Sequence, residues 1–160
     1  MKRLLIVAFL SGLVGFVLGN AFWYLASPLW IDRVVSESQP AVVAQDAVLA
    51  TGTVSGVDFV HQGAGTATVL QTGTGRILRF TEFEVTNGPA LEVWLVKHDN
   101  PRSNDDVKDS EWISLGALKG NVGDQNYDIP EDLDIADYGS VVIWCEPFGV
   151  LFAGASLDPA

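Results

Sequence analysis

Three side chains in this sequence have the chemistry to bind a metal ion or to carry electrons. Cys145 is the only cysteine, and His61 and His98 are the only histidines. A thiolate and two imidazoles form a ligand set that suits copper or haem iron. The sole methionine is Met1, so the rest of the chain offers no axial methionine. Cys145, His61 and His98 are therefore the candidate metal ligands, and haem or copper is the candidate cofactor.

Both histidines also have an ordinary structural interpretation. His61 precedes Gln62-Gly63-Ala64-Gly65 and His98 precedes Asp99-Asn100-Pro101, and both contexts are typical of loops. Loop histidines are common, so this interpretation is favoured over a joint metal site. CxxCH is absent, which excludes covalent c-type haem attachment, and no CxxC pair indicates zinc. A single cysteine also excludes an intramolecular disulfide.

Cys145 lies in the most apolar segment after the N-terminal region. Residues 140–145 are mostly β-branched or aromatic and predict a strand, Glu146-Pro147-Phe148-Gly149 predicts a turn, and residues 150–157 predict a second strand. Alternation along the strand places Cys145 on the face of Val141 and Ile143, and Trp144 on the other face. Cys145 is thus either a buried hydrophobe or a sheltered redox thiol, which would need partial exposure and a nearby positive group.

Three ordered motifs resemble the DM13 domain family over about residues 49–157. They are Trp144-Cys145-Glu146-Pro147-Phe148 followed by residues 151–155, Asn87-Gly88-Pro89-Ala90-Leu91 between Phe83 and residues 93–95, and residues 118–127 with Pro130. The resemblance implies a role in electron transfer through a characteristic cysteine, used as a bare thiol or as a ligand of a prosthetic group. Cys145 is then the redox candidate. His61 joins it as a candidate cofactor-binding residue because residues 61–68 resemble the opening of the family domain, and Trp144 joins it as an aromatic that could line a pocket.

Other clusters are interpreted as ordinary structure. Two acidic segments, near residues 99–109 and 132–137, contain oxygen ligands that calcium uses, but their spacing does not follow an EF-hand, so solvated loops are favoured. Strand aromatics dominate the cores of sandwiches, and core packing is expected for each of these residues: Trp94, Trp112, Trp144, Tyr127, Phe80 and Phe83.

The N-terminus has the pattern of a membrane anchor. An uncharged run from Leu4 to Ile31 exceeds the roughly 20 residues that span a bilayer. Lys2 and Arg3 favour a cytoplasmic N-terminus, and the aromatic residues Trp23, Tyr24 and Trp30 fit the opposite interface. Residues 1–31 are therefore predicted to be a single-pass signal anchor, with the rest of the chain extracytoplasmic. Cleavage after Gly19-Asn20-Ala21, giving a secreted protein, is the alternative. Gly15 and Gly19 form a GxxxG, a candidate helix-dimerisation motif.

The remaining chain predicts an irregular linker and one β domain. Residues 32–48 lack a sustained apolar period and are expected to be a tether. Residues 49–158 alternate short apolar runs with Gly, Asn, Asp and Pro, so the prediction is an all-β domain, an antiparallel sandwich or a partly closed barrel. Expected strands are 49–54, 65–71, 76–85, 91–97, 112–118, 126–129, 140–145 and 150–156.

The charge of the chain and the absence of known catalytic motifs limit the classes of function that fit it. The net charge is −11, and because the residues before 49 carry equal numbers of acidic and basic groups, all of it falls on the predicted domain. Such a surface repels nucleic acid and anionic lipid. Hydrolase, P-loop, dinucleotide-binding and HExxH motifs are absent, so nothing indicates a stand-alone enzyme. The leading hypothesis is a redox domain with a membrane-bound partner. The alternatives are a non-enzymatic binding module in which Cys145 only packs, and a barrel that encloses a small apolar ligand.

Overall fold

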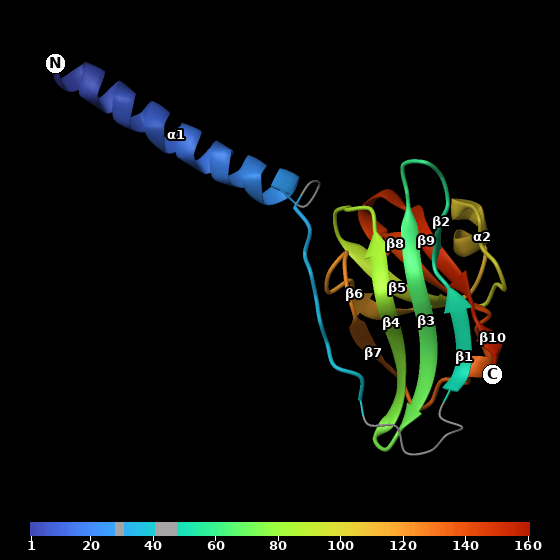
Figure 1. Cartoon of the computed structure of the whole chain (residues 1–160). Helices are drawn as coiled ribbons and strands as arrows, with labels where there is room; N and C mark the ends of the chain where they lie inside the picture. Colours follow the sequence, from blue (N-terminus) through green and yellow to red (C-terminus); the bar gives the residue numbers. More distant parts are fainter. Residues whose placement is uncertain (28–30, 41–47) are drawn as a thin grey trace. The chain divides into compact units, whose positions relative to one another are not determined.

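The computed structural model describes residues 1–27, 31–40 and 48–160, in two compact units, Met1–Ile31 and Asp32–Ala160 (Figure 1). The first unit is one helix, α1 (Lys2–Ala26), in which Gly15 and Gly19 lie about one turn apart. Its stretch Lys2–Trp23 has a mean hydropathy of 2.2 and is long and apolar enough to cross a membrane. This confirms the predicted apolar helix. Trp30, the side chain of Tyr24 and residues 41–47 of the expected linker lie outside the described residues.

The second unit is a sandwich of two antiparallel sheets with five strands each (Figure 1). The first sheet, in the order β10-β1-β3-β4-β7, consists of Asp158–Pro159, Val48–Thr53, Gly63–Thr72, Gly75–Val85 and Gln125–Ile129. The second, in the order β2-β9-β8-β5-β6, consists of Ser55–Gly56, Val150–Ser156, Ser140–Cys145, Leu91–Val96 and Trp112–Ala117. The two sheets are separate, so of the two predicted architectures the sandwich is confirmed and the partly closed barrel is not.

The main core fills the space between the sheets. Alternation along β8 places Val141, Ile143 and Cys145 in this core, while Val142 and Trp144 belong to a second cluster on the outer face of the same sheet. The short helix α2 (Asn104–Lys108) covers that second cluster, because its buried Val107 packs there. The predicted faces of these five β8 residues are therefore confirmed.

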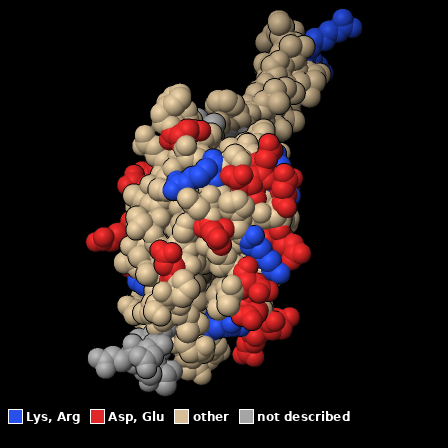
Figure 2. All heavy atoms as spheres, turned by 90° about the vertical axis from the view of Figure 1, so that its right-hand side faces the viewer, with Lys and Arg blue, Asp and Glu red and all other residues tan. Residues whose placement is uncertain are grey.

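All eight predicted strands are present, and the connections between them contain short helical segments. The acidic segment expected as a solvated loop contains α2, whose start is held by a capping box between Ser103 and Asp106. Single turns of 3-10 helix occupy Ile135–Asp137 and Glu146–Phe148. The acidic character is visible on the face in Figure 2, where Asp and Glu are spread over the domain and outnumber Lys and Arg.

Residues 32–38 are irregular, as expected of the linker, yet they are fixed to the sandwich. Arg33 N donates to Asn121 Oδ1 at 2.7 Å, Val35 N to the Val122 carbonyl at 2.9 Å, and Glu37 N to the Asp124 carbonyl at 2.9 Å. We call this segment the N-terminal strap. The loop 118–124 thus fixes the irregular strap to the sandwich through partners that lie more than 80 residues away in sequence.

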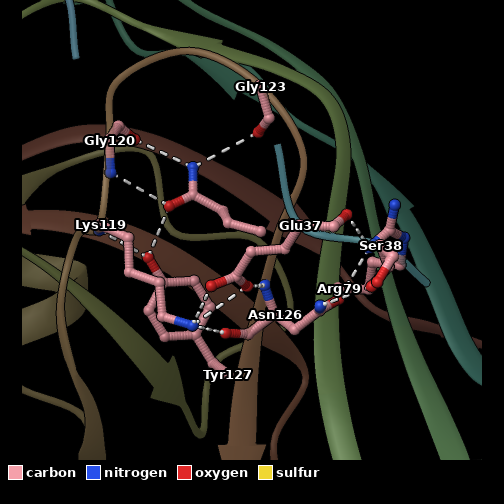
Figure 3. Close-up of polar contacts among 9 residues, drawn as sticks. Glu37, Ser38, Arg79, Lys119, Gly120, Gly123, Asn126 and Tyr127 are labelled. Carbon is pink, nitrogen blue, oxygen red and sulfur yellow. Dashed lines mark hydrogen bonds and ion pairs between the residues drawn. The ribbon is translucent and has the colours of Figure 1, made fainter. Parts of the chain in front are cut away.

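Polar groups fasten the strap beside β7 (Figure 3). Glu37 accepts from Lys119 Nζ at 2.9 Å and from Asn126 N at 2.7 Å. Burial raises the pKa of Glu37, but these hydrogen bonds, with the charges of Lys119 and Arg79, outweigh it and hold the pKa below its usual range. The Lys119 ammonium also lies 5.1 Å from the ring centroid of Tyr127. The carboxylate is therefore ionised at neutral pH and well bonded.

Gln125 organises the loop that receives the strap. Its side chain is fully buried, accepts from Gly120 N and Tyr127 Oη, and donates to the Gly120 and Gly123 carbonyls (Figure 3). Burial raises the pKa of Tyr127 to about 12, so the phenol stays protonated and can donate. We call Glu37, Lys119, Gln125, Asn126 and Tyr127 the polar clamp.

Candidate functional site

Cys145 is the last residue of β8 and is enclosed by the sandwich. It pairs with Leu91 on β5 and with Val150 on β9. Its side chain faces the core between the sheets and is 1 % exposed. The strand pattern predicted an interior or a sheltered pocket, and the structure places the thiol in the interior.

Two groups of the backbone contact the thiol. Cys145 Sγ donates to the Pro89 carbonyl at 3.2 Å, and a backbone hydrogen bond from Phe148 reaches the sulfur. Burial raises the pKa of the thiol, the hydrogen bond from Phe148 lowers it, and the charge of Glu146 raises it further, with a net increase. The sulfur is therefore a protonated thiol at neutral pH, less reactive than a free cysteine.

The loop at residues 86–90 covers this end of the core. A Cβ on Gly88 would lie 2.7 Å from the Phe152 ring, so only glycine allows the loop to approach so closely. Ala90 has φ of +45°, a left-handed conformation that costs a non-glycine residue about 1 kcal/mol. The Ala90 carbonyl accepts from Glu146 N at 3.5 Å. The cover over Cys145 is thus close-fitting and carries local backbone strain.

His61 reaches the same region from the loop 57–62. Its ring packs edge-on against Phe152, with 4.4 Å between ring centroids, and Nδ1 lies 2.8 Å from Asp58 Oδ2. The side chain is 24 % exposed. Phe152 thus packs against the imidazole and lies close to Gly88, whose neighbour Pro89 accepts the hydrogen bond of the thiol. His61 and Cys145 lie at one end of the sandwich, and each is hydrogen bonded to other groups in the described structure.

Trp144 and His98 lie elsewhere. Trp144 points to the outer face, where its ring centroid is 5.2 Å from that of Trp94, which stacks on Trp112 at 3.7 Å. His98 follows the far end of β5, where Val96 pairs with Ser140, while Cys145 is at the opposite end of β8. Its Nδ1 accepts from Asn100 N at 3.1 Å. The structure therefore brings His61 near the Cys145 region and leaves Trp144 and His98 apart from it.

A comparison with known families identifies the family of this chain. The family model described as Electron transfer DM13 matches residues 57–157, more than half of the chain. The chain belongs to the DM13 family. Neither a curated protein nor a solved structure matches it.

The DM13 motifs form two different parts of the domain. The segments 87–91 and 144–148, far apart in sequence, converge on the Cys145 thiol. The third motif, residues 118–127, builds the polar clamp and receives the N-terminal strap. Sequence reasoning missed the role of Phe152, the Pro89 carbonyl and the strained Ala90, although all three stand inside the quoted motifs.

A metal or haem group does not fit the described residues around Cys145. No group of three His, Cys, Asp or Glu side chains in residues 1–27, 31–40 and 48–160 is arranged to hold a metal ion. A hollow of about 260 Å³ beside the loop 86–90 is lined by polar residues such as Gln62, Thr86 and Asn87, without Cys145. Haem needs a larger apolar cavity. The described residues around Cys145 therefore do not form a metal or haem site.

Proposed function

We propose that this DM13 protein is a membrane-anchored, extracytoplasmic domain that takes part in electron transfer, with Cys145 as the residue on which the role depends. The observation that carries the proposal is the convergence of two family motifs on one thiol. Lys2 and Arg3 before the apolar stretch support a cytoplasmic N-terminus, which leaves the domain on the other side. A signal anchor accounts for the 25-residue α1 better than a short signal-peptide core of about 7–15 residues does.

Exposure of the Cys145 thiol is the first step that a reaction with a partner needs. With the loop 86–90 in place, the thiol is protonated and unreachable, so the cover must open and the proton must leave to solvent before reaction. The thiolate can then attack one sulfur of a partner's disulfide. The partner's S–S bond breaks as a mixed disulfide forms with Cys145, so Cys145 is oxidised and the partner's other sulfur leaves reduced, as a thiolate; attack by a further thiol on the mixed disulfide then restores the Cys145 thiolate and passes the oxidation on. A single cysteine fits this exchange because the partner supplies the second sulfur.

A binding module is the second candidate, and one specific observation favours it. Cys145 is 1 % exposed in an apolar core, which is the ordinary environment of a structural cysteine. In this case the thiol only packs, and the acidic surface or an edge strand binds the partner.

Thiol labelling separates the two functions. The full-length chain is labelled with a maleimide across a range of urea concentrations below the unfolding transition, and Ala117→Cys, an exposed position, reports the fully accessible rate. An electron-transfer role predicts labelling of Cys145 through local opening, with a weak urea dependence. Labelling that occurs only with global unfolding, and so has the full urea dependence of stability, would establish the structural role instead.

Gly88→Ala tests whether the cover is the barrier. The new Cβ would lie 2.7 Å from the Phe152 ring, so the loop must move away from the core. We expect faster labelling of Cys145 in this variant. The labelling rate of Ala117→Cys, measured in the same background, should not change. Equal rates for Cys145 in Gly88→Ala and in the unmodified chain would show that the loop does not gate the thiol.

A further inference from the structure

Large apolar side chains stand exposed at the tips of two neighbouring loops. Phe59 is 88 % exposed and Val60 51 % in the loop 57–62, and Phe148 is 70 % exposed in the turn 146–149. The first loop projects beyond the sheets between β2 and β3 (Figure 1). A group of exposed apolar side chains that lie together is typical of a surface that binds another protein or a membrane.

The loop 86–90 joins these two tips at one end of the sandwich. Thr86 Oγ1 donates to the Val60 carbonyl at 3.0 Å, and Thr86 N donates to the Gln62 carbonyl at 2.9 Å. On its other side, the Ala90 carbonyl accepts from Glu146 N in the turn that carries Phe148. The exposed side chains therefore belong to one contiguous group of loops.

The loop that carries Phe59 is held by internal hydrogen bonds. Asp58 Oδ1 accepts from Val60 N at 2.7 Å and from His61 N at 2.6 Å, and Val57 N donates to the His61 carbonyl at 3.0 Å. These bonds hold the backbone of the loop, and the Phe59 side chain at its tip is exposed. The exposed aromatic side chain is thus part of a hydrogen-bonded loop.

The chain joins the sandwich at this same end. Asp32 Oδ1 accepts from Asn87 Nδ2 and Asn121 Nδ2, both at 2.9 Å, and Asn87 follows Thr86 in the loop that holds Val60. Asp32 directly follows the uncharged run that ends at Ile31. At the other end of the sandwich, the turn 72–75 faces Glu131, Asp132 and Asp134 across an open hollow. We call the end with Asp32 and the loops 57–62, 86–90 and 146–149 the attachment end.

We propose that the attachment end rests on the membrane surface, with Phe59, Val60 and Phe148 inserted among the lipid headgroups. This rests on the membrane anchoring in the proposed function. The partner is a bilayer because the chain enters this end directly from the apolar run, and apolar loop tips of this kind enter the boundary between headgroups and acyl chains. The net charge of −11 disfavours anionic lipids, so zwitterionic headgroups fit. Contact here places the cover over Cys145 beside the membrane, within reach of a membrane-bound partner.

An environment-sensitive fluorophore tests this contact in the full-length chain. The chain is reconstituted into phosphatidylcholine vesicles, and a nitrobenzoxadiazole label is attached to Phe59→Cys or Phe148→Cys. Val48→Cys is the matched control, because Val48 is also an exposed apolar residue but pairs with Leu70 toward the opposite end. The parent chain, labelled in parallel, measures any background from Cys145.

The result expected is a blue-shifted emission from labels at 59 and 148, quenched by a nitroxide near the lipid headgroups, with neither effect at 48. Labels at 59 and 148 that behave like the label at 48 would overturn the proposal. A blue shift that persists in lipid-free amphipol and grows with protein concentration would also overturn it, since a second copy would then cover the tips. Flotation of the protein with the vesicles tests the anchor separately, so loss of anchoring and loss of loop contact are distinguished.

Discussion

The Cys145 region and the polar clamp are both built from DM13 motifs. Apolar packing stabilises the first, whereas hydrogen bonds stabilise the second. The Cys145 thiol is enclosed by apolar side chains and has two backbone contacts. The clamp instead joins Gln125, Tyr127, Lys119 and Glu37 through a dense set of hydrogen bonds. Beside the thiol, Ala90 has a strained backbone, whereas the clamp bonds its buried polar groups.

This difference teaches which region can open. Opening the clamp breaks several hydrogen bonds at once and exposes partners that were matched to one another, which makes it costly. Opening residues 88–90 alone breaks the bonds from Cys145 Sγ to the Pro89 carbonyl and from Glu146 N to the Ala90 carbonyl, and it relieves the strain at Ala90, while Thr86 and Asn87 can stay bonded. The clamp is therefore the fixed part of the domain and the cover over Cys145 is the part suited to move.

Gln125→Leu should have the largest effect, because it removes the centre of the clamp. Leucine leaves Gly120 N, its carbonyl and the Tyr127 hydroxyl without their partner in a buried place. Unsatisfied buried groups cost about 1–3 kcal/mol each, and we expect a loss of about 3 kcal/mol in total. Urea denaturation of the full-length chain in mild detergent, followed by tryptophan fluorescence, measures it.

Gln71→Leu is the matched control for that variant. Gln71 also bonds backbone carbonyls, those of Thr72 and Gly75, but its side chain is exposed, so water replaces the lost bonds. We expect a change of about 0.5 kcal/mol or less. Equal losses for Gln71→Leu and Gln125→Leu would contradict the view that the clamp is the fixed part.

Cys145→Ala should have a smaller effect than Gln125→Leu. Removing one sulfur from the apolar core leaves a small cavity and no unsatisfied charge, and we expect a loss of about 1–2 kcal/mol in urea denaturation. Cys145→Ser retains a hydroxyl that can donate to the Pro89 carbonyl, and this variant should also fold. A loss as large as that of Gln125→Leu would mean that the thiol is as essential to the fold as the clamp.

Much of the fold could be predicted from local patterns. The strands near Cys145 follow from β-branched residues and a turn at Glu146-Pro147-Phe148-Gly149, and the faces of Cys145 and Trp144 follow from alternation. Those rules act over a few neighbouring residues, so one sequence is enough to apply them. Sequence could not decide between a sandwich and a barrel, because closure depends on which distant edge strands pair.

The site was less predictable, because its contacts join distant residues. The bond from Cys145 to the Pro89 carbonyl spans 56 positions, and the fit of Gly88 against Phe152 has no local signal. Glu37 looked like part of a free linker, since its partner Lys119 is 82 residues away. The family resemblance already favoured His61 over His98, but only the strand order shows that the two histidines lie at different ends of the sandwich.

Glu37→Gln tests the clamp side of the comparison, through the pH dependence of the attachment of the strap. The pKa of Glu37 is lowered in the folded protein, so its contribution is present above the ordinary carboxyl pKa of 4.5 and is lost as pH falls through the folded value. We expect the strap to detach in acid at a cost of about 1 kcal/mol, because the pair is partly exposed. Faster hydrogen exchange at Val35 N as pH falls reports this detachment.

The Glu37→Gln variant should show the detached strap already at neutral pH, with only a small acid response. Glu84→Gln, an exposed glutamate on β4, is the matched control and should retain the acid response of the unmodified chain. An acid response that survives in Glu37→Gln would assign the detachment to another carboxyl group.

Asp58→Asn should have the smallest effect, confined to the loop that holds Phe59. The hydrogen bonds from the His61 side chain and backbone lower the pKa of Asp58 to about 2, so its contribution is present above pH 3.8 and is lost only as pH falls toward 2. Asparagine removes the charge at neutral pH, and the amides of Val60 and His61 should then exchange faster with solvent. Global stability should match that of Asp132→Asn, an exposed control. Unchanged exchange at Val60 would mean that Asp58 does not hold the tip, and the loop would then owe its shape to the bonds from Thr86.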